Sequence, residues 1–391
     1  MEHFAGRSNG VLRSVHGSPC IRRRRARAIS VAPTLPQLAA LPMNDKQPPA
    51  KKAPSSRTDG VVTLEQVAEL AGVSPSTVSR ILNGTAAVSQ AKKDAVQAAI
   101  QELGFRPNPV ARGLAGGRTL SIGVVTQIIS SPFYGEALLG IERELERAGY
   151  VPLFVSGNWN EDDERKAIET LLSRRVDGII VLAGLLKDEA LLALTASLPT
   201  VVVGRQLTGP QLYSFRFDNR LGARAATQHL IEQGHRRIAF IAGDLVHDDA
   251  VDRQQGYFEA LATAGIAVDQ NLIVQSDYTE AGGMQAVSRL LERDARFTAM
   301  FCSNDQMAIG ACLGLHRRNL RVPDDVSLVG FDDLIMARYA MPPLTTVRQS
   351  VYEMGSEAAM AMLKLLNGGS PNVQLPAPEL VVRESTRRLH R

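Results

Sequence analysis

Cysteine is scarce in this chain of 391 residues, where it occurs only as Cys20, Cys302 and Cys312. The odd number, with two of the three inside apolar runs, argues against a disulfide framework and favours a reducing compartment, the cytoplasm. Long apolar runs are missing too: no stretch approaches the roughly 18 apolar residues that a membrane-spanning helix needs. The run 22–25 consists of arginine, but no apolar segment follows it, so a secretory signal is not expected.

Sequence signatures of catalysis are also absent. The chain has no Gly-x-Ser-x-Gly elbow, no Gly-x-x-x-x-Gly-Lys-Ser/Thr loop, and no Gly-x-Gly-x-x-Gly motif after the first expected strand of its body. Its seven histidines are scattered without the spacing of a zinc site, at positions 3, 16, 229, 235, 247, 316 and 390. We therefore expect no enzyme activity, no metal and no cofactor. An α/β enzyme with an added regulatory domain at its amino-terminal end is therefore only the third of the three functions we consider for this chain, after the two that are described below.

Positive charge is concentrated near the start of the chain. Residues 1–59 hold 11 Lys/Arg against 3 Asp/Glu, whereas residues 119–391 hold 27 against 33. A basic amino-terminal segment followed by an acidic remainder suits a polyanionic partner that binds at the amino-terminal end. A basic segment that is merely solvated and binds nothing fits the composition equally well. Residues 1–59 are rich in Pro, Ser, Arg and Ala without periodicity, which predicts a disordered extension. Both Met1 and Met43 are candidates for the first residue.

From Thr119 onward, apolar strands alternate with amphipathic helices. Strands are expected at 120–126, 151–155, 178–182, 200–203, 237–242, 299–302 and 327–331. Helices are expected at 134–148, 161–174, 188–196, 222–232, 251–264, 279–291 and 305–318. Near-continuous Val/Ile strands that alternate with helices indicate parallel sheets covered on both faces. There are too many units for one compact sheet, so the sequence predicts an α/β body of two lobes with a cleft between them, behind an all-α head.

The head, near residues 61–116, begins with a pattern typical of a helix-turn-helix. Thr63 and Gln66 form a capping box at the start of the first helix, Leu64–Ala71. Gly72 permits a tight turn, Ser74 can cap the second helix, and Pro75 can occupy its first position.

The second helix of the head presents a short polar face. Val78 and Ile81 are expected to point inward, which leaves an outward set of Ser76, Thr77, Ser79 and Arg80. Such a face suits a DNA major groove, where Arg80 can donate two hydrogen bonds to guanine. The alternative is a small helical hairpin without a DNA-binding role, because such a hairpin could show a similar apolar pattern.

A third helix is expected from the cap Ser89 to Leu103, and one more short helix could follow from Asn108. That segment is too short to be stable alone. Pairing with a symmetry mate over bent DNA would order it, with Leu114 as an apolar wedge in the minor groove. On the residues alone, a flexible linker is the better prediction.

Several motifs make a resemblance specific. The stretches 62–74 (VTLEQVAELAGVS), 77–83 (TVSRILN) and 105–108 (FRPN) resemble the head of the lactose-repressor (LacI/GalR) family. The similarity continues through 234–239 (GHRRIA), 303–308 (SNDQMA), 330–333 (GFDD) and 344–347 (LTTV), so it covers roughly residues 61–385.

The resemblance implies a bacterial transcriptional regulator. It places Pro75, Ser76 and Arg80 at base-reading positions and makes Leu114 the hinge-helix leucine. Pro75 departs from members with a polar or aromatic residue there, and because proline has no donor, specificity at that base step would rest on shape or a thymine methyl. The full DNA-contacting set is predicted to be Thr63, Ser74, Pro75, Ser76, Thr77, Ser79, Arg80, Asn83, Asn108, Arg112 and Leu114.

Ligands of open α/β sheets lie beyond the carboxyl ends of the strands. Side chains that follow the expected strands are therefore the candidate effector contacts: Phe133, Trp159, Arg205, Asp249, Arg253, Asn304 and Asp332. Taken singly, most acidic residues at the ends of strands are helix caps or turn residues, and Trp159 could simply cover the surface. The family resemblance favours a binding role for Arg253, Asn304 and Asp332. Together these residues suit the hydroxyls of a sugar, a mono- or disaccharide.

A purine-like corepressor is the alternative ligand, and the stretch 301–303 (FCS) near the cleft would suit its flat ring. The second-ranked hypothesis for the whole chain is a periplasmic-type solute-binding protein without a DNA role, which predicts an export signal and no head.

The sequence thus predicts a cytoplasmic repressor that binds a near-palindromic operator as a homodimer. The expected parts are the extension 1–59, the DNA-binding domain 60–107, the hinge 108–118 and the effector-binding domain 119–385. The lobe nearer the head should comprise 119–217 and 347–377, and the distal lobe 218–346 and 378–385. No membrane contact is expected.

Overall fold

The structure, a computed structural model, describes residues 62–82, 88–105 and 118–389. The basic extension and four predicted DNA-contacting residues lie outside these ranges, namely Asn83, Asn108, Arg112 and Leu114. Among the described residues, no helix is long and apolar enough to cross a membrane.

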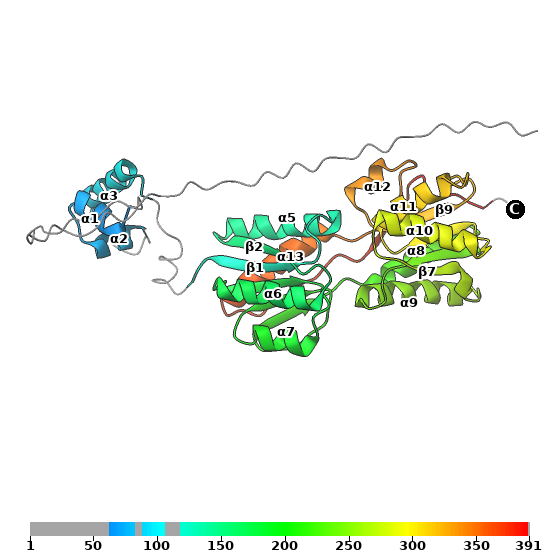
Figure 1. Cartoon of the computed structure of the whole chain (residues 1–391), viewed down its shortest axis with the longest axis horizontal. Coiled ribbons are helices and arrows are strands. Elements are labelled where there is room, and N and C mark those ends of the chain that lie inside the picture. The colour runs from blue at the N-terminus through cyan, green and yellow to red at the C-terminus, as the bar shows by residue number, and fades with distance from the viewer. Residues whose placement is uncertain (1–61, 83–87, 106–117, 390–391) are drawn as a thin grey trace, which may run out of the picture. The chain divides into compact units, whose positions relative to one another are not determined.

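The head consists of three helices, labelled in Figure 1: α1 (Leu64–Leu70), α2 (Pro75–Leu82) and α3 (Gln90–Leu103). Their small core is formed by Val67, Ala68, Val78, Val96, Ala99 and Phe105. Gly72 adopts a φ of 64° between α1 and α2, and Gly104 a φ of 63° after α3, so both turns use the left-handed conformation that glycine tolerates. The helix-turn-helix that the sequence predicts is confirmed.

A five-stranded parallel sheet follows, in the order β2-β1-β3-β4-β5. Its strands are β1 (Ser121–Thr126), β2 (Val151–Ser156), β3 (Gly178–Leu182), β4 (Thr200–Val203) and β5 (Leu212–Phe215). It is covered by α5 (Pro132–Arg147), α6 (Glu161–Ser173), α7 (Asp188–Thr195) and α13 (Val351–Leu366). Helix α13 comes from far along the chain and packs against α5, β3 and β4. We call this unit the amino-terminal lobe.

The second sheet has six strands, in the order β11-β10-β9-β8-β6-β7. The strands are β6 (Ile238–Ala242), β7 (Ile273–Gln275), β8 (Ala299–Cys302), β9 (Ser327–Asp332), β10 (Thr345–Arg348) and β11 (Glu379–Val381). Its helices are α8 (Asn219–Glu232), α9 (Asp248–Thr263), α10 (Glu280–Glu292), α11 (Asp305–His316), α12 (Ile335–Tyr339) and the 3₁₀ turn Gln270–Leu272. Only the pair β10–β11 is antiparallel. We call this unit the carboxy-terminal lobe.

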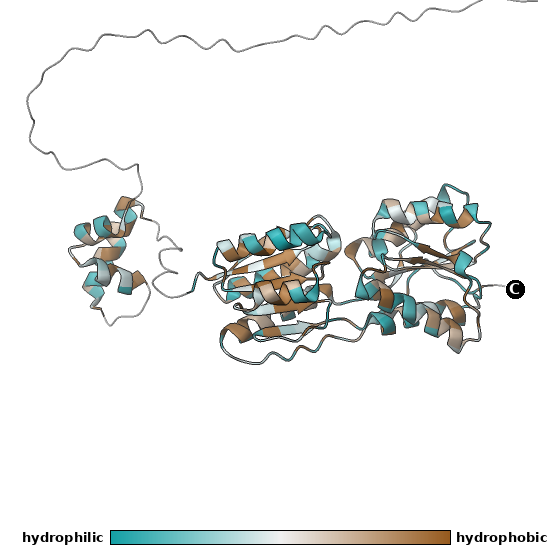
Figure 2. Ribbon diagram, turned by 60° about the horizontal axis from the view of Figure 1, so that its bottom comes forward, coloured by the Kyte–Doolittle hydropathy of each residue, from teal (hydrophilic) through white to brown (hydrophobic). Residues whose placement is uncertain are grey.

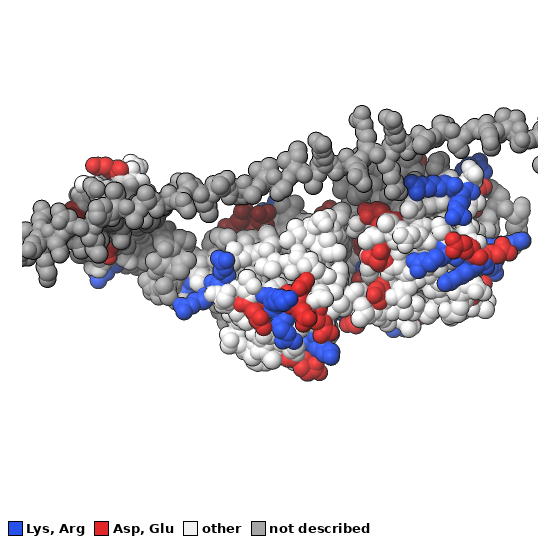
Figure 3. All heavy atoms as spheres, viewed as in Figure 1, with Lys and Arg blue, Asp and Glu red and all other residues white. Residues whose placement is uncertain are grey.

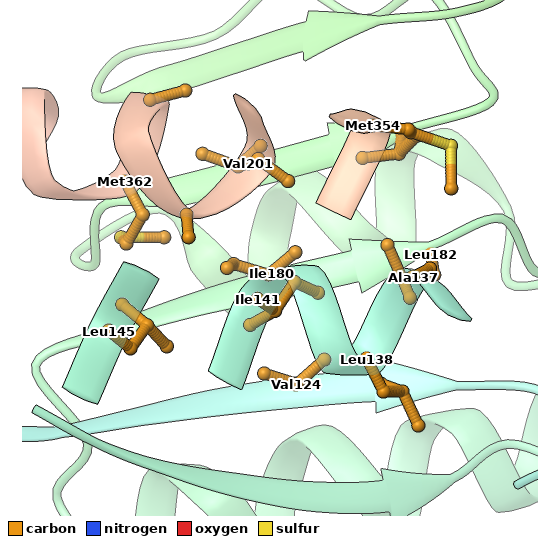
Figure 4. Packing of buried hydrophobic residues seen from close by; sticks show 14 of the residues in the cluster. Val124, Ala137, Leu138, Ile141, Leu145, Ile180, Leu182, Val201, Met354 and Met362 are labelled. Atoms are coloured by element: carbon orange, nitrogen blue, oxygen red, sulfur yellow. The ribbon is translucent and has the colours of Figure 1, made fainter. Parts of the chain in front are cut away.

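The cores of both lobes lie between sheet and helices. In Figure 2 the strands are mostly brown, and the teal residues gather on the outer faces of the helices. Figure 4 shows one core: Val124, Ile180 and Val201 of neighbouring strands lie against Ile141 of α5 and Met362 of α13. Burial of such aliphatic side chains is the main stabilising term, roughly 1.5–3 kcal/mol for each.

The predicted α/β architecture is confirmed, with differences in detail. All seven expected strands and all seven expected helices of the body are present within a few residues of their predicted bounds. The strands β5, β7 and β10 and the helix α12 were not predicted. The expected side-chain cap of α3 is wrong, because the Ser89 side chain makes no capping hydrogen bond. The first strand begins at Ser121, since Leu120 has a φ of 53°.

Candidate functional site

The starts of α1 and α2 are fixed by short polar side chains. The backbone N–H of Gln66 donates to Thr63 Oγ1 at 3.4 Å, and the N–H of Thr63 donates to Gln66 Oε1 at 2.8 Å, which completes the expected capping box. At α2, the N–H of Thr77 donates to Ser74 Oγ at 3.2 Å. These bonds satisfy backbone donors that a helix start would otherwise leave unpaired.

Helix α2 turns one polar side away from the core of the head. Val78 is buried, whereas Ser74, Pro75, Ser76 and Arg80 are exposed. Thr77 and Ser79 are half-buried, so they flank this face rather than form its centre. The hydroxyls of Ser74 and Ser76 lie 2.9 Å apart. The exposed side of α2 therefore combines small hydroxyl side chains with a single guanidinium group.

The body contains a cavity of about 690 Å³, which is in the size range of small-molecule sites. Its lining comes from loops at the carboxyl ends of strands in both lobes and from the helices that follow. All seven predicted effector contacts line this one cavity: Phe133, Trp159 and Arg205 from the amino-terminal lobe, and Asp249, Arg253, Asn304 and Asp332 from the carboxy-terminal lobe.

Arg253 is the most heavily bonded residue of the cavity. Its Nε donates to Asn219 Oδ1 at 2.9 Å, and its Nη1 donates to the carbonyl oxygen of Ser303. Nη2 lies 3.5 Å from Asp249 Oδ2 and 3.9 Å from Asp332 Oδ1, and the guanidinium carbon sits 4.1 Å from the centroid of the Phe331 ring. A buried guanidinium held this way presents its remaining N–H edge in a fixed direction.

Asp332 ends β9 with a φ of 114° and is almost fully buried. Gln349 Nε2 donates to Asp332 Oδ1 at 2.8 Å. Burial raises the pKa of Asp332 to about 7, against the opposing effects of Arg253 and the Gln349 hydrogen bond. Burial also raises the pKa of Asp305 behind it, which accepts from Thr346 Oγ1 at 2.6 Å and from the Leu334 N–H at 2.8 Å. Near neutral pH, Asp332 can therefore either accept or donate a hydrogen bond to a ligand.

Aromatic rings form another part of the lining. Trp159 has a φ of 53°, and its N–H donates to the side chain of the buried Gln127 at 3.0 Å. The Tyr134 ring meets the Trp159 ring edge-on at 6.2 Å, and Phe133 contacts Tyr134 in the same manner at 5.3 Å. From the other lobe, the His247 ring lies 4.1 Å from the Trp159 ring.

Asn304 and Arg205 each serve a structural purpose as well. Asn304 caps α11 by accepting from the Met307 N–H at 2.9 Å, and its amide donates to the Tyr278 carbonyl at 3.0 Å. Arg205 Nη1 donates to the Leu186 carbonyl at 2.6 Å, while its Nε and Nη2 are buried without a hydrogen-bond partner among the described residues. These two donors are available to an oxygen-bearing ligand.

Sequence reasoning missed further polar residues that line the cavity, among them Asn219, Tyr278 and Gln349. Tyr278 follows β7 and Gln349 follows β10, and neither strand was predicted, so the loops after them were not considered. Asn219 begins α8, which starts three residues before its predicted bound, Gly222. The proposed flat-ring wall at 301–303 is wrong, because Phe301, Cys302 and Ser303 are all fully buried and none of them lines the cavity.

Two family models match this chain: the lacI family of bacterial regulatory proteins over residues 63–108, and a periplasmic binding protein-like domain over residues 227–386. The HTH-type transcriptional regulator GalR of Escherichia coli (strain K12) is 40% identical over 328 residues, which cover 83% of this chain and 96% of GalR. The chain belongs to the LacI family of bacterial regulatory proteins. It is a DNA-binding transcriptional regulator with a two-lobed domain behind its helix-turn-helix.

Solved structures of other LacI-family proteins have the same fold. The lac repressor dimer bound to operator and the anti-inducer ONPF is 31% identical, with a TM-score of 0.74, and the match covers 84% of this chain and all of that one. The complex of the transcriptional regulator CelR with cellobiose is 36% identical, with a TM-score of 0.61, and the match covers 83% and 99% of the two chains.

Proposed function

We propose that this LacI-family protein is a cytoplasmic repressor that binds a near-palindromic operator as a dimer and is switched by a sugar held between its lobes. The observation that carries the proposal is that seven predicted side chains from both lobes line one cavity. No enzymatic step is part of the proposal.

In this proposal α2 enters the major groove. Ser76 and Arg80 read base edges, Pro75 contacts a thymine methyl or reads shape, and Ser74, Thr77 and Ser79 hold the backbone of the DNA together with Thr63. Asn83, Asn108, Arg112 and Leu114 complete the contacts, with Leu114 wedging open the operator centre. We accordingly assign residues 60–107 to the head, residues 108–118 to the hinge and residues 119–385 to the effector-binding domain.

A sugar is favoured because the cavity offers many polar groups of both kinds beside aromatic rings. Arg253 and Arg205 donate, Asp249 accepts, and Asp332 with its raised pKa can do either near neutral pH. A ligand without an acceptor would leave Nε and Nη2 of Arg205, which have no hydrogen-bond partner among the described residues, unpaired, and this costs roughly 1–3 kcal/mol for each donor. The CelR structure is a complex with cellobiose, and this supports the same ligand class here.

A dimer is favoured by an exposed apolar patch at α12, formed by Ile335, Tyr339 and Met341. Their exposed fractions are 52%, 82% and 92%. Large apolar side chains that gather in this way usually mark a contact surface. The lac repressor structure contains a dimer bound to operator. A second copy of this chain is therefore the proposed partner at the patch.

The switch follows from the position of the cavity between two lobes. A ligand that contacts both lobes favours whichever lobe arrangement makes more contacts with it, and it shifts the population by its difference in affinity. Coupling energies of this kind are typically about 1–3 kcal/mol. In the proposal, the lobe movement changes the separation of the two hinge segments of the dimer, so their short helices form or melt.

The test is a gel-shift titration of the full chain on the upstream DNA of its neighbouring genes, against a random duplex. It is repeated with sugars and, as the alternative ligand class, with hypoxanthine and guanine. We expect preferential binding to one upstream duplex and a change of affinity with a sugar. Equal affinity for every duplex under all conditions would overturn the proposal, and a response to purines alone would replace the sugar.

A further inference from the structure

The charges that line the effector cavity are strongly unbalanced. Two cationic side chains reach it, Arg205 and Arg253, whereas six carboxyl groups line it: Asp188, Asp248, Asp249, Asp277, Glu280 and Asp332. No lysine belongs to the lining. The electrostatic character of the cavity is therefore acidic, even when Asp332 with its pKa of about 7 is partly protonated.

Both guanidinium groups already face carboxylates. Arg253 lies within 3.5 Å of Asp249 and 3.9 Å of Asp332. Arg205 Nη1 lies 3.2 Å from Asp188 Oδ1. Nε and Nη2 of Arg205, which have no hydrogen-bond partner in the described part of the chain, can donate to a ligand oxygen, but the positive charge that a phosphate would need is offset by Asp188.

Three of the carboxylates are not offset in this way. Among the described residues, Asp248, Asp277 and Glu280 form no ion pair. Asp277 accepts from the N–H and hydroxyl of Thr279, at 3.0 and 2.7 Å, and Glu280 accepts from Gln306 Nε2 at 3.1 Å, all of which are neutral donors. These three carboxyl groups therefore line the cavity without a cationic partner among the described residues. An anionic ligand would be repelled there, and since Asp248 and Asp277 are exposed, water and salt weaken this repulsion.

We propose that the effector is a neutral polyol, an unphosphorylated sugar or glycoside, and that the cavity discriminates against sugar phosphates and sugar acids. This inference rests on the proposed sugar-switched function and narrows its ligand class. The polar groups of the lining fit hydroxyls: a hydroxyl can donate to the carboxylates and accept from Arg205 and Arg253 at the same time. An ionised phosphate or carboxylate group can only accept, so at the position where it replaces a hydroxyl it removes a donor to the carboxylates and adds a negative charge beside them.

The inference is tested on the full chain by isothermal titration with pairs of ligands that differ in charge. The pairs are galactose and galactose 1-phosphate, glucose and glucose 6-phosphate, and lactose and lactobionate. We expect the neutral member of a binding pair to bind at least about tenfold more tightly than its charged counterpart, with a smaller ratio at high salt, where exposed charges are screened.

Each outcome separates the inference from the proposed function. A charged member that binds as tightly as its neutral counterpart, or more tightly, would overturn the inference while leaving a sugar-switched regulator in place. If no pair binds and hypoxanthine or guanine does, the sugar effector itself is contradicted and the inference fails with it. The absence of binding by any of these compounds would contradict both.

The electrostatic cause is tested with a matched pair of variants. Asp248→Asn removes an exposed carboxylate from the lining without breaking any hydrogen bond of its side chain that the structure describes. We expect it to reduce the ratio of neutral to charged affinity by about threefold. Glu169→Gln makes the same change of charge on the exposed side of α6, outside the lining, and should leave the ratio unchanged. Equal ratios in Asp248→Asn and the unaltered protein would overturn the electrostatic explanation.

Discussion

The indole ring of Trp159 and the imidazole ring of His247 lie with their centroids 4.1 Å apart and their planes inclined by 47°. Trp159 follows β2 of the amino-terminal lobe, and His247 immediately precedes α9 of the carboxy-terminal lobe. The contact therefore joins the two lobes where both residues line the effector cavity. Since Trp159 is the only tryptophan of the chain, its fluorescence reports on this contact without interference from other indoles.

His247→Ala should shift the emission maximum of Trp159 to longer wavelength, because the indole loses the ring that covers it and meets more water. Steady-state fluorescence of the purified protein measures the shift. His316→Ala, on the exposed side of α11, is the control and should leave the spectrum unchanged. Identical spectra for His247→Ala and the unaltered protein would show that the two rings are not in contact in solution.

Asp332→Asn should abolish the effector response while operator binding persists. The change removes a carboxylate from the cavity and leaves the head untouched. A gel shift with and without a responsive sugar distinguishes the two properties. A variant that still responds normally would show that Asp332 takes no part in effector binding, and loss of both properties would point to misfolding.

The same variant should also alter the dependence of stability on pH. Burial raises the pKa of Asp332 to about 7, so the folded state retains a proton that the unfolded state has already lost at lower pH. The contribution of this group to the free energy of unfolding therefore falls as pH rises from about 4 to about 7 and stays constant above that. The free energy of unfolding of Asp332→Asn, minus that of the unaltered protein, should therefore increase by roughly 1–3 kcal/mol as the pH rises from 5 to 8. Urea unfolding at both pH values measures this difference. A difference that does not vary with pH would contradict the raised pKa.

Arg80→Ala should reduce discrimination between the operator and random DNA by about 1–3 kcal/mol, because in the proposed complex the exposed guanidinium of Arg80 donates two hydrogen bonds to a guanine. Competition gel shifts measure the discrimination, and isothermal titration of the sugar should give an unchanged affinity. Lys92→Ala, an exposed cation on α3, is the control and should leave discrimination intact. Equal effects of the two substitutions would show that Arg80 contributes only its charge.

The close packing of α10 against α11 depends on two glycines that face the opposite backbone. A Cβ at Gly310 would overlap the carbonyl oxygen of Glu280, and one at Gly283 would overlap that of Met307. Gly310→Ala should therefore lower the free energy of unfolding by about 1–3 kcal/mol, measured by urea unfolding. Gly135→Ala in α5 meets no atom within 4 Å and should be neutral or stabilising by up to about 1 kcal/mol. Similar stability of the two variants would contradict this packing.

Most of the fold could be predicted because its strands are short apolar runs of β-branched residues, such as 178–182 and 200–203, separated by amphipathic helices. The strand β7 was not predicted because it has only three residues, Ile273–Gln275. The strand β10 was not predicted because its four residues, Thr345–Arg348, do not alternate regularly between apolar and polar side chains. Both pair in register with longer neighbours, β6 and β9, and those partners rather than local propensity define them.

The candidate site was predictable where a recognised strand preceded a polar loop, as with Trp159 and Arg205, and where the family resemblance marked a position, as with Arg253 and Asp332. It was not predictable at Tyr278 and Gln349, which follow the missed strands. The contact between Trp159 and His247 is of another kind, because it depends on how the two lobes close on each other. No pattern within one segment of the chain contains that information.

The exposed patch at α12 leads to a prediction about assembly. Met341 is 92% exposed and Tyr339 82%, an exposure that large apolar side chains seldom keep unless a partner covers them. Met341→Glu places a charge in the proposed interface, and burying that charge without a counter-ion would cost more than the contact gains. We expect the variant to be monomeric in sedimentation velocity and to bind operator at least about tenfold more weakly, since a monomer brings one head to the DNA instead of two. Val382→Glu, at another exposed apolar position beyond β11, should remain dimeric. Sugar affinity should be unchanged in both variants, because the cavity lies within one chain, and a dimeric Met341→Glu protein would place the interface elsewhere.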